Sequence, residues 1–217
     1  MIISSDPLTS VYTERLDSPL IQRLVDIHWY GRQGKGWDGK PPVIVDVTWG
    51  KKGGFWKGSD EAVIGMDLDR DRVPSGGVHA HSSYLPFREG SIDVLAYDPP
   101  HIPDNGKERP KYMAEGYTIA WGENDINGAT RDLVGEAAVV LAPGGIIIAK
   151  ISNQIQRNMK RWQVPAFMTS CEYFGLTVCD EVVKVRERAM SQPWGEGRQR
   201  HSWQRHCSFV VARKGGC

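Results

Sequence analysis

The chain has 217 residues, of which 40% are hydrophobic and 24% charged, and its formal net charge is +1. This length supports one substantial hydrophobic core, and this balance excludes a disordered tail or a highly charged binding protein. The charge is unevenly distributed, because residues 150–217 carry 12 Lys or Arg against 5 Asp or Glu. A basic C-terminal third suggests a surface that faces a polyanion, although a solvated face of a sheet would have a similar composition.

The four cysteines form no Cys-x-x-Cys pair, so neither a disulfide framework nor a zinc site is expected. The His79-x-His81 pair, and His201 with His206, have no cysteine or carboxylate at a supporting spacing, and no metal is expected there. No apolar run approaches the roughly 18 residues that a membrane span needs, and the start MIISSDPLTS lacks a signal-peptide pattern. We therefore expect a soluble, cytoplasmic protein with no membrane partner.

The chain alternates between helical and extended patterns. Apolar residues recur at helical spacing over 19–29, where Ser18 resembles an N-cap. Further helices are expected over 128–145 and from about 154 to 174, with a kink or break at Pro165. Short continuous apolar runs, typical of buried parallel strands, occur at 43–49, 62–68, 92–97 and 146–151.

The tail segments 176–188 and 207–214 alternate in polarity and predict an antiparallel pair. The whole order predicts an α/β fold, namely a Rossmann-like open sheet that is mostly parallel with an antiparallel C-terminal strand pair. One domain is expected over residues 1–217. Because ligands bind outside the carboxyl ends of the strands in such sheets, the residues just after each run are the functional candidates.

Glycines and acids follow the first two runs. The first run is followed by a turn that contains Asp46, Thr48, Trp49, Gly50 and Gly53. Glycines there let the backbone approach a ligand, but the spacing matches neither a phosphate-binding loop nor G-x-G-x-x-G, so a purely structural turn is an alternative.

The second run ends in Asp67-Leu68, 21 residues after Asp46. An acid at this place can reach the two hydroxyls of a ribose. A solvated acidic turn, formed with Asp69 and Asp71, is the alternative interpretation.

The third run carries the most specific pattern of the chain. The letters LPF at 85–87 precede the run, and DPPH at 98–101 follows it. Together with the glycine turn and the acid after the second run, these motifs resemble the class I S-adenosylmethionine-dependent methyltransferases. Within that class they resemble the DPPY-type enzymes that methylate exocyclic amines of nucleic-acid bases, and the size is similar to that of small phage-like DNA methylases. The resemblance covers about residues 43–151.

The resemblance implies S-adenosyl-L-methionine as the cofactor. Its binding residues would be Asp46, Thr48, Trp49, Gly50, Gly53, Asp67, Leu68 and Ser82. Ser82 stands near the place where such enzymes often have an acid that helps to hold the cofactor's adenine. The catalytic motif would be Asp98, Pro99, Pro100 and His101.

The chemistry of the reaction explains the DPPH motif. An exocyclic base nitrogen is a poor nucleophile, because its lone pair is delocalised into the ring. A carboxylate that accepts one N–H, and a carbonyl of the Pro-Pro turn that accepts the other, favour a pyramidal nitrogen whose lone pair points at the methyl group. The prolines hold both acceptors in place before the substrate arrives. His101, where the family usually has Tyr, Phe or Trp, would stack on a flipped base.

A single domain of this length must recognise its substrate through insertions, and two are expected at 102–128 and 189–206. The second insertion and its flanks combine basic and aromatic residues suited to phosphate contact and stacking. These are Arg186, Arg188, Arg198, Arg200, Arg205 and Trp203. An exposed hairpin without a ligand is the alternative.

The sequence therefore predicts a methyltransferase that acts on nucleic acid, with DNA as the first choice of partner and adenine N6 preferred over cytosine N4. An RNA base N-methyltransferase is the alternative within the class. A non-catalytic nucleic-acid-binding module with a methyltransferase-like fold is the alternative outside it, and the ability to bind S-adenosylmethionine distinguishes the two.

Overall fold

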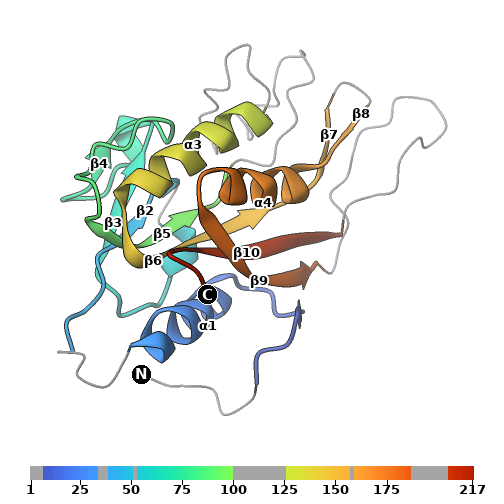
Figure 1. Cartoon of the computed structure of the whole chain (residues 1–217), viewed down its shortest axis with the longest axis horizontal. Coiled ribbons are helices and arrows are strands. Elements are labelled where there is room, and N and C mark those ends of the chain that lie inside the picture. Colours follow the sequence, from blue (N-terminus) through green and yellow to red (C-terminus); the bar gives the residue numbers. More distant parts are fainter. Residues whose placement is uncertain (1–6, 34–38, 51–52, 100–125, 157–158, 187–204) are drawn as a thin grey trace.

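The computed structural model describes residues 7–33, 39–50, 53–99, 126–156, 159–186 and 205–217. Eight strands form one sheet (Figure 1): β1 (Val11–Tyr12), β2 (Ile44–Asp46), β3 (Val63–Asp67), β4 (Val78–His79), β5 (Ile92–Tyr97), β6 (Leu141–Ile151), β9 (Leu176–Val185) and β10 (His206–Lys214). Their order across the sheet is β1-β9-β10-β6-β5-β2-β3-β4.

The pairing confirms the predicted fold class. From β6 to β4 all neighbouring strands are parallel, and β1 is also parallel to β9. β10 alone of these strands runs antiparallel to both of its neighbours, β9 and β6. The short outer strands β1 and β4 were not predicted, since two-residue strands leave no periodic pattern in the sequence.

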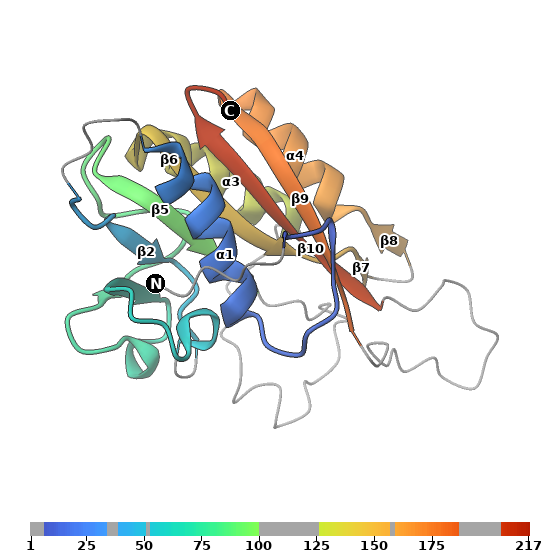
Figure 2. The same ribbon diagram turned by 90° about the horizontal axis from the view of Figure 1, so that it is seen from below.

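Helices cover both faces of the sheet. α1 (Ser18–His28) lies on one face, and α3 (Ile126–Val140) and α4 (Gln163–Tyr173) lie together on the other, as Figures 1 and 2 show. Because successive side chains of a strand point to opposite faces, Val94 and Ala96 of β5 pack toward α1. Leu95 and Tyr97 pack toward α3 and α4. Each face therefore has its own hydrophobic core.

Two predicted helix boundaries are wrong. α3 ends at Val140, and the stretch through Pro143 and Gly144 already belongs to β6. Pro143-Gly144-Gly145 was expected to be the helix-to-strand turn that closes the helical segment, but these three residues lie within β6, and the helix ends before them. At Gly145 a Cβ would lie 2.9 Å from the Ala142 carbonyl oxygen and 3.0 Å from that of Ile92, so this close approach requires glycine.

The segment expected to be helical from residue 154 instead begins as an antiparallel pair, β7 (Gln154–Gln156) and β8 (Met159–Arg161). The helix begins only at Gln163. Pro165 then lies in its first turn, where the missing N–H has no intrahelical partner to lose. Pro165 is therefore compatible with the helix and does not break it.

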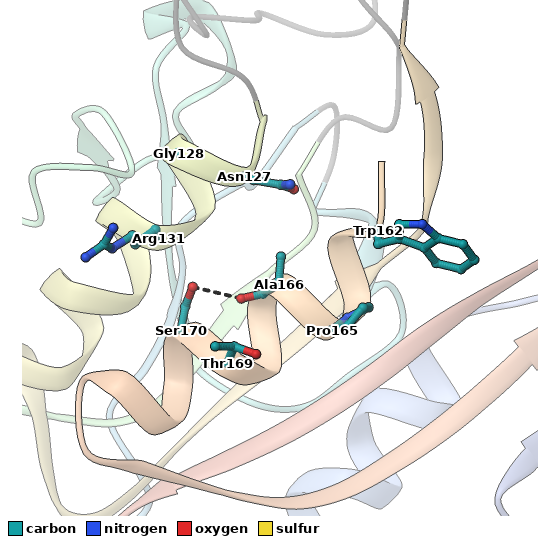
Figure 3. Close-up of a pocket in the computed structure, with 8 residues that line it drawn as sticks. All are labelled: Asn127, Gly128, Arg131, Trp162, Pro165, Ala166, Thr169 and Ser170. Atoms are coloured by element: carbon teal, nitrogen blue, oxygen red, sulfur yellow. Dashed lines mark hydrogen bonds between the residues drawn. The ribbon is translucent and has the colours of Figure 1, made fainter. Parts of the chain in front are cut away.

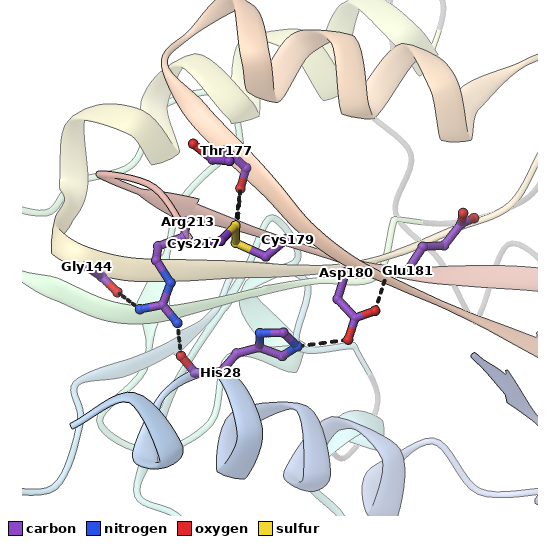
Figure 4. The surroundings of a disulfide bond; sticks show 8 residues. All are labelled: His28, Gly144, Thr177, Cys179, Asp180, Glu181, Arg213 and Cys217. Carbon is purple, nitrogen blue, oxygen red and sulfur yellow. Dashed lines mark hydrogen bonds and ion pairs between the residues drawn. A yellow bond between two sulfur atoms is a disulfide. The ribbon is translucent and has the colours of Figure 1, made fainter. Parts of the chain in front are cut away.

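No disulfide framework was expected, but the structure contains one disulfide. Cys179 of β9 is bonded to Cys217, with Cα atoms 5.7 Å apart (Figure 4). β10 returns antiparallel to β9, and Gly215 and Gly216, both with φ of +95°, turn the last residues back toward Cys179. The pairing depends on this turn, which spacing along the chain does not reveal. Cys171 and Cys207 are free thiols and are buried.

Among the helices of the described ranges, none is both long enough and apolar enough to cross a membrane.

Candidate functional site

The point at which the strand order of the sheet reverses lies between β2 and β5. β2 pairs with β3 on one side and with β5 on the other, so the chain departs from β2 in opposite directions at this point. Ligands of open α/β sheets bind at such a switch point. Asp46 ends β2 opposite Ala96 of β5, and Asp98 follows β5 directly. The strand register therefore brings a predicted cofactor residue and a predicted catalytic residue together.

Thr48 connects these two acids. Its hydroxyl accepts a hydrogen bond from the Asp98 N–H at 2.7 Å and donates to Asp46 Oδ1 at 3.3 Å. The Thr48 N–H also donates to Asp46 Oδ1, at 2.9 Å. The backbone at the start of the Asp-Pro motif is thus fixed to the turn after β2, and Pro99 beside it is buried.

Asp46 is almost fully enclosed, with 2% of its surface exposed. Its second carboxylate oxygen, Oδ2, accepts a hydrogen bond from Trp56 Nε1 at 3.1 Å. Burial raises the pKa of Asp46 to about 7, although the N–H of Thr48 works in the opposite direction. The negative charge of Asp98 adds to the increase. The two neighbouring carboxyl groups therefore differ in environment, since one is deeply buried and the other is partly open to solvent.

Asp67 holds the glycine turn in place. Its Oδ2 accepts a hydrogen bond from the Gly50 N–H and its Oδ1 one from the Asp69 N–H, both at 2.8 Å. Gly50 and Gly53 adopt φ of +63° and +56°, a region that favours glycine. The turn after β2 and the acid after β3 thus form one unit, as expected if both face the same ligand. The contact of Asp67 with a ribose stays a prediction.

The ring of Trp49, another predicted cofactor residue, packs directly against two glycines, Gly53 and Gly65. A Cβ on Gly53 or on Gly65 would lie 2.5 Å from its ring. Leu68 is half-buried, and its carbonyl oxygen lies 2.9 Å from His79 Nε2. Ser82 is half-buried in the turn after β4. Their roles toward a cofactor stay predictions.

The structure adds a chain of ion pairs that was not predicted. Lys150 Nζ lies 3.0 Å from Asp98 Oδ2 and 2.9 Å from Asp17 Oδ2. Lys184 Nζ lies 2.6 Å from Asp17 Oδ1 and also donates to the Arg15 carbonyl at 2.9 Å. Asp17 occupies the N-cap position of α1, where Ser18 was expected, but its side chain makes no capping bond, because both oxygens bind lysines.

A signal for this network does exist in the sequence. Lys150 is the one charged residue within the apolar run 146–151, and a buried lysine needs an anionic partner. Identifying that partner requires the strand register.

Several predicted residues lie outside the described ranges, namely Pro100, His101, Arg188, Arg198, Arg200 and Trp203. So do most of the two expected insertions. Of the predicted nucleic-acid contacts, Arg186 and Arg205 are described, and the Arg186 N–H donates to the Arg205 carbonyl at 2.7 Å. This hydrogen bond lies at one end of the β9–β10 pair. At the same end, Ser208 of β10 is paired with Ile151, the last residue of β6. The two arginines therefore lie at the carboxyl edge of the central strands.

A shallow pocket of about 580 Å³ lies between α3 and α4, on the sheet face opposite α1 (Figure 3). Its lining includes Asn127 and Arg131 of α3, Trp162 before α4, and Ala166, Thr169 and Ser170 of α4. Lys150 packs with the α1 face, so the pocket is separate from the ion-pair chain. No sequence pattern indicated this pocket. Within the described ranges, no group of three or more His, Cys, Asp or Glu side chains is placed to hold a metal ion.

No family model matches the chain. The release factor glutamine methyltransferase of Bradyrhizobium diazoefficiens is 30% identical over 132 residues, which are 56% of this chain and 44% of that protein. The chain thus spans less than half the length of this relative.

Solved structures share the fold at low sequence identity. A Bacillus halodurans protein, provisionally named as a methyltransferase, has a TM-score of 0.55 at 13% identity, covering 89% of this chain and 98% of that one. A provisionally named DNA modification methylase from Thermus thermophilus, solved with S-adenosyl-L-methionine, has a TM-score of 0.41 at 13% identity, covering 64% and 54%. The chain has the α/β, Rossmann-like methyltransferase fold.

The raised pKa of Asp46 predicts a pH-dependent stability. Its folded-state pKa of about 7 exceeds the ordinary value of 3.8, so between these values the folded chain binds more protons than the unfolded one. Its contribution to the free energy of unfolding is full below pH 3.8 and falls as the pH rises to about 7. Asp46→Asn should remove this fall, as measured by urea unfolding from pH 4 to pH 8 without cofactor. Asp132→Asn, which changes an exposed carboxyl of α3, should keep the parent's pH dependence. Equal slopes for the parent and Asp46→Asn would contradict the assignment.

Proposed function

We propose that this chain is an S-adenosylmethionine-dependent methyltransferase that modifies an exocyclic amine of a nucleic-acid base, with adenine N6 in DNA as the first choice and cytosine N4 as the second. The observation that carries the proposal is the Thr48 hydroxyl, which fixes the Asp98 backbone to the glycine turn at 2.7 Å. A cofactor held by that turn would present its methyl group beside the Asp-Pro motif. The methyltransferase fold and the similarity to the Bradyrhizobium diazoefficiens enzyme support the same reaction class.

The cofactor would lie across the carboxyl ends of β2 and β3. Positive φ at Gly50 and Gly53 lets the backbone of the turn pass close to a ligand. Asp67 lies at the end of β3, bonded to this turn, where the Rossmann arrangement places a ribose-binding acid. S-adenosyl-L-methionine fits this set, because it offers a ribose to Asp67 and a sulfonium cation to a site rich in carboxylates.

Asp98 would act on the substrate nitrogen. A carboxylate that accepts one N–H of a conjugated amine draws the lone pair out of the ring and stabilises the positive charge that grows on nitrogen during transfer. Its backbone is held by Thr48 and its side chain by Lys150. The acceptor is therefore oriented before the substrate binds, which lowers the cost of reaching the transition state.

The basic charge of the C-terminal third supports a nucleic-acid substrate. Arg186 and Arg205 lie at the sheet edge that carries Asp98, where they could contact the phosphates next to a flipped base. DNA and RNA share these chemical features, so an RNA base is the alternative substrate.

A glutamine carboxamide is a second candidate, favoured by the similarity to an enzyme named for glutamine methylation of release factors. Its NH₂ group is also planar and conjugated, and a carboxylate acceptor would activate it in the same way. Assays with a glutamine-containing peptide beside DNA and total RNA distinguish the two substrate classes.

The cofactor assignment predicts a loss of affinity in Asp67→Ala. Removing an acceptor for two ribose hydroxyls should weaken S-adenosylmethionine binding by about 1.5–3 kcal/mol, the range for hydrogen bonds to charged groups. Isothermal titration calorimetry measures the change, and circular dichroism checks that the turn still folds. Asp71→Ala, which alters an exposed acid nearby, serves as the control and should bind like the parent. Unchanged affinity in Asp67→Ala would exclude this ribose contact.

The catalytic assignment predicts that Asp98→Ala abolishes methyl transfer from labelled S-adenosylmethionine while cofactor affinity stays near that of the parent. Asp98→Asn keeps one acceptor and loses the charge, so its rate should fall by about 10²–10³-fold, as for the loss of one transition-state hydrogen bond. Asp132→Ala should retain the parent rate. Near-parental transfer by Asp98→Ala would show that DPPH is not the catalytic motif, and a parent that does not bind the cofactor would favour the non-catalytic alternative.

A further inference from the structure

Asp98 is paired with a lysine before any substrate is present. Asp98 Oδ2 lies 3.0 Å from Lys150 Nζ, and the two side chains are 28% and 13% exposed. Lys150 Nζ also lies 5.5 Å from the centre of the Phe55 ring, in the core on the α1 face. A pair this enclosed is weakly screened by solvent, so the cation acts on Asp98 much more strongly than a surface lysine would.

The strand register makes the pair a fixed feature of the fold. Tyr97 of β5 is paired with Ala149 of β6, so the next residues, Asp98 and Lys150, follow side by side. Side chains alternate along a strand, which places Lys150 on the same face as Ile146 and Ile148. The separation of the two charged groups is therefore determined by two hydrogen-bonded strands.

Lys150 stays charged in this environment. Burial alone would lower its pKa, but the negative charges of Asp98 and Asp17 raise the pKa of Lys150 above its ordinary value. Asp17 in turn binds Lys184, whose side chain is 6% exposed. The result is a chain of alternating charges, Asp98–Lys150–Asp17–Lys184, in which the Lys150 ammonium group contacts two carboxylates.

We propose that Lys150 is a positioning residue for methyl transfer, which it serves by holding the Asp98 carboxylate ionised and aimed at the substrate amine. This inference rests on the proposed function. In the reaction the nitrogen lone pair forms the N–C bond as the C–S bond breaks, and the electron pair of that bond returns to sulfur. The nitrogen becomes cationic and releases one proton to water. An ionised Asp98 stabilises that cation throughout, whereas a protonated Asp98 would not.

The test compares Lys150→Met with Lys184→Met. Both variants remove one buried ammonium from the same chain, but Lys184 pairs with Asp17, one step further from Asp98. Lys150→Met should lower kcat by about tenfold or more, leave KM for S-adenosylmethionine near the parent value, and move the acid limb of the pH–rate profile up by about one unit or more. The direction follows because loss of the cation disfavours the ionised form of Asp98. Lys150→Arg should restore most of the rate and the parent's acid limb.

Lys184→Met should keep the parent's acid limb even if its thermal stability falls as much as that of Lys150→Met. A parental kcat and acid limb in folded Lys150→Met would overturn the inference, and so would equal shifts in both Met variants.

The carboxyl ¹³C titration of Asp98 by NMR provides a readout that needs no substrate. Its midpoint should rise in Lys150→Met and not in Lys184→Met, and an unmoved midpoint would overturn the inference. A parent that transfers no methyl group to any substrate would overturn the proposed function, which this titration does not test. The two failures are therefore distinguishable.

Discussion

The parallel register of β2, β5 and β6 determines which side chains meet at the carboxyl edge of the sheet. Opposing residues of β2 and β5 place the Thr48 hydroxyl 2.7 Å from the Asp98 N–H, and the pairing of β5 with β6 places Lys150 3.0 Å from the Asp98 carboxylate. A shift of one residue in either pairing would turn Asp98 or Lys150 to the opposite face. The packing of Val94 and Ala96 on the α1 face, and of Leu95 and Tyr97 on the opposite face, opposes such a shift. Core packing and site geometry thus depend on the same register.

The two acids of the site are set in opposite electrostatic environments. Asp46 is enclosed with Trp56 and has a pKa raised by burial to about 7, whereas Asp98 lies against a charged lysine. Neighbouring carboxyl groups whose environments differ in this way can take different roles in one site. The buried Asp46 bonds to the turn after β2 through Thr48, while the Asp98 carboxyl is partly exposed at the carboxyl edge of the sheet. Thr48 connects the two acids, because its hydroxyl donates to the Asp46 carboxyl and accepts from the Asp98 N–H.

Sequence patterns predicted the parallel core well, because buried parallel strands leave continuous apolar runs and the acids at their ends follow directly. Asp46, Asp67 and Asp98 were chosen as candidates in this way, and they lie at the ends of β2, β3 and β5. The β7–β8 pair was missed because Ile155 and Met159 are four residues apart, which is a helical spacing, so the predicted helix was begun too early. Pro165 was interpreted as a kink or break because its position relative to the start of α4 was not known.

Contacts between distant segments could not be predicted from the sequence. The bond between Lys150 and Asp17 joins residues 133 positions apart, and it forms because α1 packs under β6 with its first turn at the carboxyl edge. The disulfide between Cys179 and Cys217 likewise depends on a turn of two glycines after β10.

The carboxyl edge around Asp98 is proposed to transfer a methyl group to an amine of a nucleic-acid base. The decisive experiment is to incubate the chain with isotope-labelled S-adenosyl-L-methionine and DNA, digest the DNA to nucleosides, and locate the label by mass spectrometry. We predict labelled N6-methyldeoxyadenosine, or N4-methyldeoxycytidine in its place. Absence of label from every nucleoside of DNA, and of RNA treated in parallel, with folded protein that binds the cofactor, would contradict the proposal.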